Sequence, residues 1–149
     1  PSQQGENMDT TVYTSYRDEA IQRAVERHSS YRVEVAGEAV DTGDPEAIAR
    51  VVSREIPDAE APVHAEEIGA LPGALATDWA VRVGEARLII GPDHTYGHGV
   101  AWVIYRTAAD QDAHEYHTVG GWAPNDRDTA RREIALIIDT LTRLGAQHD

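Results

Sequence analysis

The sequence predicts an α+β fold, a single domain in which helices cover an antiparallel sheet made of a hairpin and a four-strand meander, with a long C-terminal helix. Three observations support this: helical spacing of apolar residues in three segments, two-residue alternation in the segments between them, and the order in which these segments follow one another. We expect residues 12–149 to form the domain. Residues 1–11 are polar and without period, so they are expected to be a flexible leader or a vector-derived remnant, with Met8 as a native start.

Two helices are expected in the first half of the chain. Ser15 and Asp18 have the spacing of a capping box and precede an amphipathic stripe that ends at Ser29–Ser30. The second helix has the clearest start in the chain, since Asp44 can accept hydrogen bonds from the first turn and a proline follows at the first helical position. Pro57 should end this helix, because a proline inside it would remove a backbone hydrogen bond.

Alternating segments predict the strands. Tyr31–Val35 should form a half-buried strand that turns at Gly37–Glu38 into a short second strand, Ala39–Val40. The meander should then use polar connections such as the predicted turn at Ala109–Asp112. Its four expected strands are Trp79–Val83, Arg87–Ile90, Val100–Tyr105 and His114–Gly120.

The last helix should begin near Asn125 or Asp126 and run to Leu144. Its apolar residues recur on one face, and Gly145 is placed to end it. The segment 57–77 has no clear period and is rich in alanine, proline and glycine, so it is expected to be a long loop that holds a short helical turn or serves a function.

The charge of the chain indicates the kind of partner it can have. It carries 26 acidic residues against 13 basic ones, a formal charge of -13 with neutral histidine. Nucleic acids and anionic membranes are bound through clustered cations, so neither is expected as a direct partner. A protein with a basic surface is more compatible. No segment has the apolar length of a membrane span, and a cytoplasmic location is expected.

Three residue types are missing, and their absence removes several kinds of chemistry. The chain has no lysine, cysteine or phenylalanine. Without lysine, neither a Schiff-base mechanism nor a Walker-type phosphate loop is available. Without cysteine, the chain has no thiol nucleophile, disulfide or thiolate metal site. A GC-rich genome explains the missing lysine and phenylalanine without any functional cause.

Histidines are the densest group of chemically versatile side chains. His94, His98, His114 and His117 fall within 24 residues, on a loop and the start of the strand expected after it. If these ends meet, the imidazoles could bind zinc or another divalent transition metal. The spacing argues against this, because residues three apart in a strand point to opposite faces and no H-E-x-x-H, H-x-H or facial-triad spacing is present. Surface or partly buried histidines, with no cofactor, are the preferred interpretation.

Aromatic residues beside glycine-rich turns are the candidate binding residues. Trp102 is expected in the core, whereas Tyr96 and Trp122 are expected to be exposed anchors at an interface. Asp93 and Glu115 would supply an acidic rim around them. These four residues are the binding site that the sequence proposes.

Two main functions remain open, and no family resemblance decides between them. The preferred one is a non-catalytic acidic module that binds a protein partner, as an immunity protein, an antitoxin-like inhibitor or a chaperone does. The alternative is a small histidine-based or metal-dependent enzyme with its site at the four histidines. A structural subunit of a virion or other assembly is a third possibility, and the oligomeric state is left open.

Overall fold

The computed structural model describes residues 32–69, 77–93 and 99–147. In chain order the elements are β2 (Arg32–Val35), β3 (Glu38–Asp41), α2 (Pro45–Glu55), β4 (Val63–His64), the 3-10 helix η1 (Ala65–Ile68), β5 (Trp79–Val83), β6 (Ala86–Pro92), β7 (Val100–Tyr105), α3 (Ala108–Asp112), β8 (Thr118–Trp122) and α4 (Arg127–Ala146). The internal contacts of the chain separate residues 1–30 from residues 31–149, and only the second unit is described below. The expected leader and first helix lie outside the described residues.

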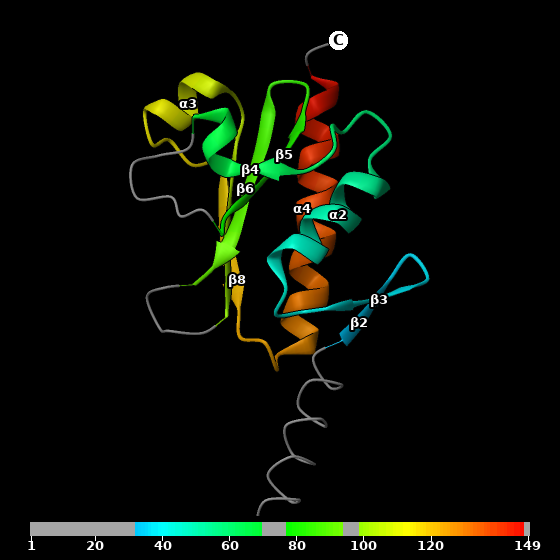
Figure 1. Cartoon of the computed structure of the whole chain (residues 1–149). Helices are drawn as coiled ribbons and strands as arrows, with labels where there is room; N and C mark the ends of the chain where they lie inside the picture. Colours follow the sequence, from blue (N-terminus) through cyan, green and yellow to red (C-terminus); the bar gives the residue numbers. More distant parts are fainter. Residues whose placement is uncertain (1–31, 70–76, 94–98, 148–149) are drawn as a thin grey trace, which may run out of the picture. The chain divides into compact units, whose positions relative to one another are not determined.

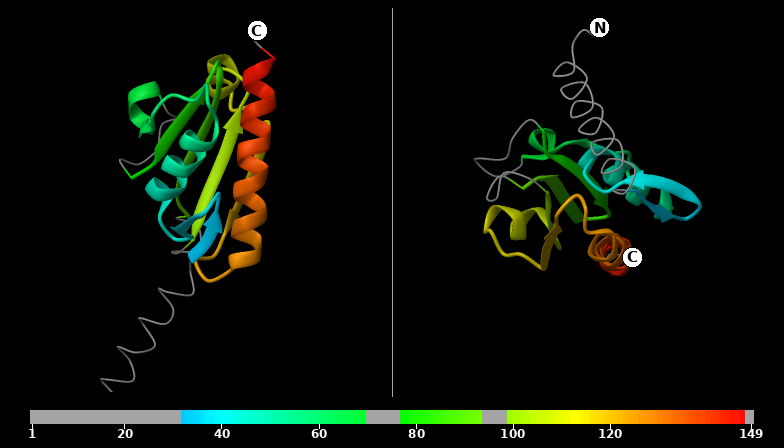
Figure 2. Two further views of the ribbon diagram at one scale, coloured as in Figure 1. Left: turned by 90° about the vertical axis from the view of Figure 1, so that its right-hand side faces the viewer. Right: turned by 90° about the horizontal axis from the view of Figure 1, so that it is seen from below.

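The strands form two antiparallel sheets. One is the hairpin β2–β3, and the other is a five-stranded meander in the order β4-β5-β6-β7-β8. Helices α2 and α4 both pack on one face of the meander, which we call the inner face (Figures 1 and 2). The predicted α+β class, with its hairpin, meander and long C-terminal helix, is therefore confirmed. The fifth strand, β4, lies in the segment 57–77, which the sequence predicts to be a long loop.

The core lies between the inner face and these two helices. Asp44 caps α2 as predicted, since its carboxylate accepts from the N–H groups of Glu46 and Ala47. The apolar stripes of both helices are buried against alternate strand residues, as the helical and two-residue periods require. The largest fully buried apolar side chains of this layer include Ile48, Val51, Val52, Val81, Leu88, Ile90, Ile104, Ile134, Ile137 and Leu141.

Two turns differ from the sequence prediction. The hairpin turns at Ala36–Gly37, one residue earlier than expected, and both residues have positive φ, as the twist of a two-residue hairpin favours. The expected polar turn at Ala109–Asp112 is the short helix α3, because the hydroxyl of Thr107 accepts from the N–H of Asp110 and caps it.

Strand β8 begins at Thr118, so the prediction of a strand from His114 is wrong. His114 has a φ of 58° and closes α3, which turns the chain out of an extended conformation. The N–H of His117 donates to the carbonyl of Ile104, although Ile104 already stands opposite Thr118 in the ladder. Two residues thus face one, which is a β-bulge at the entrance to β8.

Gly145 lies inside α4 and does not end it, because the helix continues to Ala146. Its role is close packing. A Cβ atom placed on Gly145 would come within 2.4 Å of Cγ1 of Val83, at the end of β5. The absence of a side chain therefore allows α4 to approach the sheet.

We predict that Gly145→Ala destabilises the protein by about 1–3 kcal/mol, because Val83 is β-branched and buried and must move to admit the new methyl group. Helix propensity alone predicts the opposite sign, a gain of about 1 kcal/mol. Urea unfolding followed by tryptophan fluorescence measures the difference. A more stable Gly145→Ala variant would show that the close contact does not matter.

A second prediction concerns the cap of α4. Hydrogen bonds from the hydroxyl and the N–H of Thr129 lower the pKa of Asp126. A lowered pKa in the folded state contributes stability above the unfolded pKa of about 3.9, and this contribution is lost as pH falls through the folded value. Asp126→Asn should therefore be less stable than wild type at neutral pH, and the two should converge in acid. A difference in urea midpoint that stays constant with pH would contradict this.

Candidate functional site

The face of the meander opposite α2 and α4, which we call the outer face, has no long helix over it in the described part of the chain (Figure 1). Alternate strand residues point to it, including Ile89 in β6, Val103 in β7 and Val119 in β8. These residues are apolar although they are only partly covered or exposed. An antiparallel sheet with one solvated face normally carries polar residues there, so this face is unusual.

Part of the outer face is hollowed. The outer-face hollow has a volume of about 420 Å³, and it is apolar apart from one carboxylate and two phenols. Tyr116 stands beside it with its ring 5.6 Å from that of the buried Tyr105. Burial raises the pKa of the Tyr105 phenol, which keeps this group neutral. The lining residues are Asp78, Ile89, Gly91, Pro92, Ala101, Trp102, Val103, Tyr105, Tyr116, Val119 and Gly120.

One end of the outer face is closed by a hydrogen-bonded bridge through Gln111 of α3. Its amide oxygen accepts from Arg87 of β6 at 3.1 Å, and its amide nitrogen donates to the carbonyl of Gly69, after η1, at 3.2 Å. Both Arg87 and Gln111 are buried. Desolvation, and then the charge of Arg82, lowers the pKa of Arg87. The bridge fixes α3 over the sheet and so positions the segment that carries Tyr116.

Strand β8 is an edge strand of the sheet, open on its far side within the described residues. The opposite edge strand, β4, has only two residues, and the segment before it shields β5 through a bridge from Ala59 and a hydrogen bond from the N–H of Glu60 to the carbonyl of Arg82. No strand of the described chain pairs with the far side of β8. Its five residues include neither a charge nor a proline, the features that usually protect an edge.

Three large apolar side chains flank this edge. Tyr116 and Val119 are each 57% exposed and Leu136 is 40% exposed, and these are the exposed large apolar residues of the described chain. Val119 lies in β8 and Tyr116 precedes it. Leu136 lies on α4 one turn after Glu133, which contacts Gly120 of β8, so it faces the same edge. We call Tyr116, Val119, Leu136 and the open side of β8 the β8 edge site.

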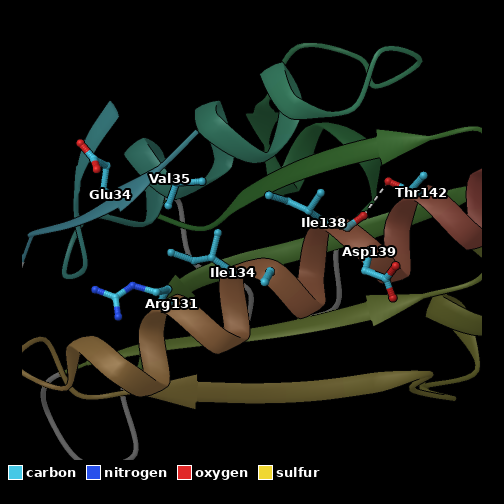
Figure 3. Close-up of a pocket in the computed structure, with 8 residues that line it drawn as sticks. Glu34, Val35, Arg131, Ile134, Ile138, Asp139 and Thr142 are labelled. Atoms are coloured by element: carbon cyan, nitrogen blue, oxygen red, sulfur yellow. Dashed lines mark hydrogen bonds between the residues drawn. The ribbon is translucent and has the colours of Figure 1, made fainter. Parts of the chain in front are cut away.

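A second hollow lies between the β2–β3 hairpin and α4. It has a volume of about 440 Å³, and Val35, Ile134 and Ile138 point into it (Figure 3). Two of its polar side chains are hydrogen-bonded to groups of α4 itself. The hydroxyl of Thr142 donates to the carbonyl of Ile138, and Asp139 accepts from Arg143. With an apolar floor and no polar group directed inward, this groove selects no ligand chemistry.

The exposure of the predicted binding residues differs from what the sequence led us to expect. Trp122 is buried, with 6% of its surface exposed, and its indole N–H donates to the carbonyl of Thr42. The prediction that Trp122 is an exposed anchor is therefore wrong. Asp93 follows β6 and is partly covered, Glu115 is exposed beside Tyr116, and Tyr96 lies outside the described residues. Trp102 is buried as predicted.

Only two of the four histidines of the predicted metal site lie within the described residues. His114 and His117 are exposed, and a ring nitrogen of His117 lies 2.8 Å from the hydroxyl of Thr118. His94 and His98 lie outside the described residues. Within residues 32–69, 77–93 and 99–147, no three metal-binding side chains come together. A site made of all four imidazoles therefore stays a prediction.

The residues that sequence reasoning missed are Tyr116, Val119 and Leu136. Tyr116 and Val119 sit in the segment expected to be an ordinary strand, and Leu136 departs from the buried stripe of the last helix. An apolar residue off the buried stripe is the one signal in the sequence that points to Leu136.

Comparisons with protein-family models, curated proteins and solved structures found no match to this chain. In the described ranges no helix has the length and apolar character needed to cross a lipid bilayer.

We predict that Gln111→Leu destabilises the protein by about 1–3 kcal/mol, because the buried Arg87 guanidinium then loses an acceptor. Replacing both partners, in Arg87→Met with Gln111→Leu, should recover most of this loss since no buried charge remains. Thermal unfolding of the two single variants and the double variant measures the coupling. Additive losses would show that the two side chains do not act together.

Proposed function

We propose that this chain is a non-catalytic acidic module that binds a protein partner with a basic surface, and that the β8 edge site is where the partner binds. The observation that supports this most is the exposure of three large apolar side chains along one strand edge, Tyr116 and Val119 at β8 and Leu136 on the helix packed behind it. Exposed apolar side chains are common singly, but a group beside an apolar hollow is typical of an interaction surface.

The charge of the chain favours a protein partner of opposite sign. At a formal charge of -13, association with a basic partner is accelerated and association with nucleic acid or an anionic membrane is opposed. Around the outer face the carboxylates of Asp78 and Glu115 lie near the apolar residues. An apolar centre with a charged rim is the usual anatomy of a protein interface.

Within the described residues, the outer-face hollow is poorly suited to catalysis. It combines apolar side chains with Asp78 and two phenols, and it has no imidazole or guanidinium in its lining. Burial raises the pKa of the Tyr105 phenol further from neutral pH, where a general acid or base works best. Inhibitor, immunity and chaperone roles, a virion subunit and a cytoplasmic location stay predictions from the sequence.

The partner is sought by affinity capture from the native host, with wild-type protein and two variants as bait. Val119→Glu places a charge in the centre of the β8 edge site, and we expect it to weaken capture of the partner by about tenfold or more, since desolvating a charge at an interface is costly. Ala39→Glu is the matched control, because it adds the same charge at an exposed position in the separate β2–β3 hairpin.

The proposal expects a basic protein that wild type and Ala39→Glu retain and Val119→Glu loses. Melting temperatures of the three baits show whether the variants are folded. Recovery of no partner, or of one that all three baits retain equally, would overturn the proposal.

A further inference from the structure

We propose that the partner binds by adding a β-strand to the open side of β8, and that this strand carries basic side chains as well as apolar ones. The inference rests on the proposed function and specifies how the partner is recognised. Strand addition draws affinity from main-chain hydrogen bonds and specificity from alternate side chains.

The direction of the free backbone groups follows from the sheet register. The N–H of Asp93 donates to the carbonyl of Gly99, so odd-numbered residues of β7 bond to β6. The carbonyl of Ile104 accepts from the N–H of His117, so even-numbered residues of β7 face β8. Their partners in β8 are Thr118, Gly120 and Trp122, which leaves the backbone groups of Val119 and Gly121 directed away from the sheet.

These two residues offer four hydrogen-bonding groups to an added strand. Each presents one N–H and one C=O, spaced as in any antiparallel or parallel ladder. Among the hydrogen bonds of turns, loops and caps in the described chain, none uses them, and the β7–β8 ladder bonds through their neighbours. The edge carries little steric hindrance, since Gly120 and Gly121 have no side chains.

The surroundings define which side chains the added strand should carry. A residue opposite Val119 would lie on the outer face, beside Val119 and within reach of Tyr116, and should be apolar. Its neighbours in the strand would face α4, where Glu133 lies over Gly120 and Leu136 is exposed. Arg132 is also on this part of α4, but its guanidinium donates to the hydroxyl of Thr129.

Charge complementarity favours a basic strand over a second copy of this chain. Glu115 and Glu133 lie beside the edge, and the whole chain carries -13. Two copies would each bring this charge to a shared edge and repel each other. A strand with alternate arginine or lysine residues gains from the same field, and salt should weaken its binding.

The test uses a defined probe, the capped peptide Arg-Val-Arg-Val-Arg-Val-Arg, and reads amide hydrogen exchange by NMR. We expect the peptide to slow exchange at Val119 and Gly121 by about tenfold or more, and to leave Thr118, Gly120 and Trp122 unchanged because β7 already protects them. The same peptide with a methyl group on every peptide nitrogen keeps its charge and side chains but cannot donate. It should bind at least roughly tenfold more weakly in fluorescence anisotropy.

Variants of Val119 distinguish the contribution of its backbone N–H to peptide binding from that of its side chain. Val119→Pro removes the outward N–H while keeping an apolar residue, and proline is tolerated on edge strands. Val119→Thr keeps the N–H and the branched shape. We expect Val119→Pro to lose peptide binding and Val119→Thr to retain most of it. The methylated peptide gives the same answer on wild-type protein if Val119→Pro does not fold.

Three results would overturn strand addition. The peptide could fail to bind up to millimolar concentration, it could bind equally with and without methylation, or it could bind without protecting Val119 and Gly121. Protection that appears with rising protein concentration alone, with a dimer in sedimentation, would assign the edge to a second copy. In each case the host capture experiment still decides the proposed function by itself. If the peptide protects the amides of Val119 and Gly121 but the host experiment captures no partner, the proposed function alone is refuted.

Discussion

The packing of α4 against β8 depends on one contact at Gly120. The carboxylate of Glu133 accepts a hydrogen bond of 2.6 Å from the indole N–H of Trp102, and a Cβ atom on Gly120 would come within 2.1 Å of Glu133. Glycine at this position lets a half-buried carboxylate lie on the strand and reach the tryptophan. The contact anchors the long helix on the last strand of the sheet, and it leaves that strand without a bulky side chain at its centre.

Further contacts join this packing to the rest of the fold. Thr42, after the hairpin, accepts from the indole of Trp122 through its carbonyl and donates through its hydroxyl to the carbonyl of Pro124. The hairpin, the end of β8 and the approach to α4 are thus tied at one buried point. Helices α2 and α4 both pack on the inner face, and of the helices in the described residues this leaves α3 and η1 to cover the outer face. The apolar outer face and the open edge follow from this division.

Periodicity in the sequence predicts most of the fold because it records burial on one side of each element. It places α2, α4 and the strands β5, β6 and β7, since their apolar residues recur at the helical or two-residue period. It fails where tertiary contacts give a residue its role. Glycine near the end of a helix usually terminates it, but Gly145 instead allows α4 to pack on Val83. Trp122 follows two glycines and resembles a turn residue, but those glycines admit Glu133 and the chain of β7.

The residues of the β8 edge site could not be predicted in the same way, because an edge is a property of strand order. Val119 alternates as any half-buried strand residue does, and only the order β4-β5-β6-β7-β8 shows that no strand of the described residues pairs beyond it. The net charge can be counted from the sequence, and it affects how this edge behaves toward other copies of the chain. It lowers the tendency of an unprotected edge to pair with copies of itself, which is the usual hazard of such an edge. An acidic chain with an uncharged edge strand therefore disfavours its own aggregation, and the same charge would attract the basic partner that we propose.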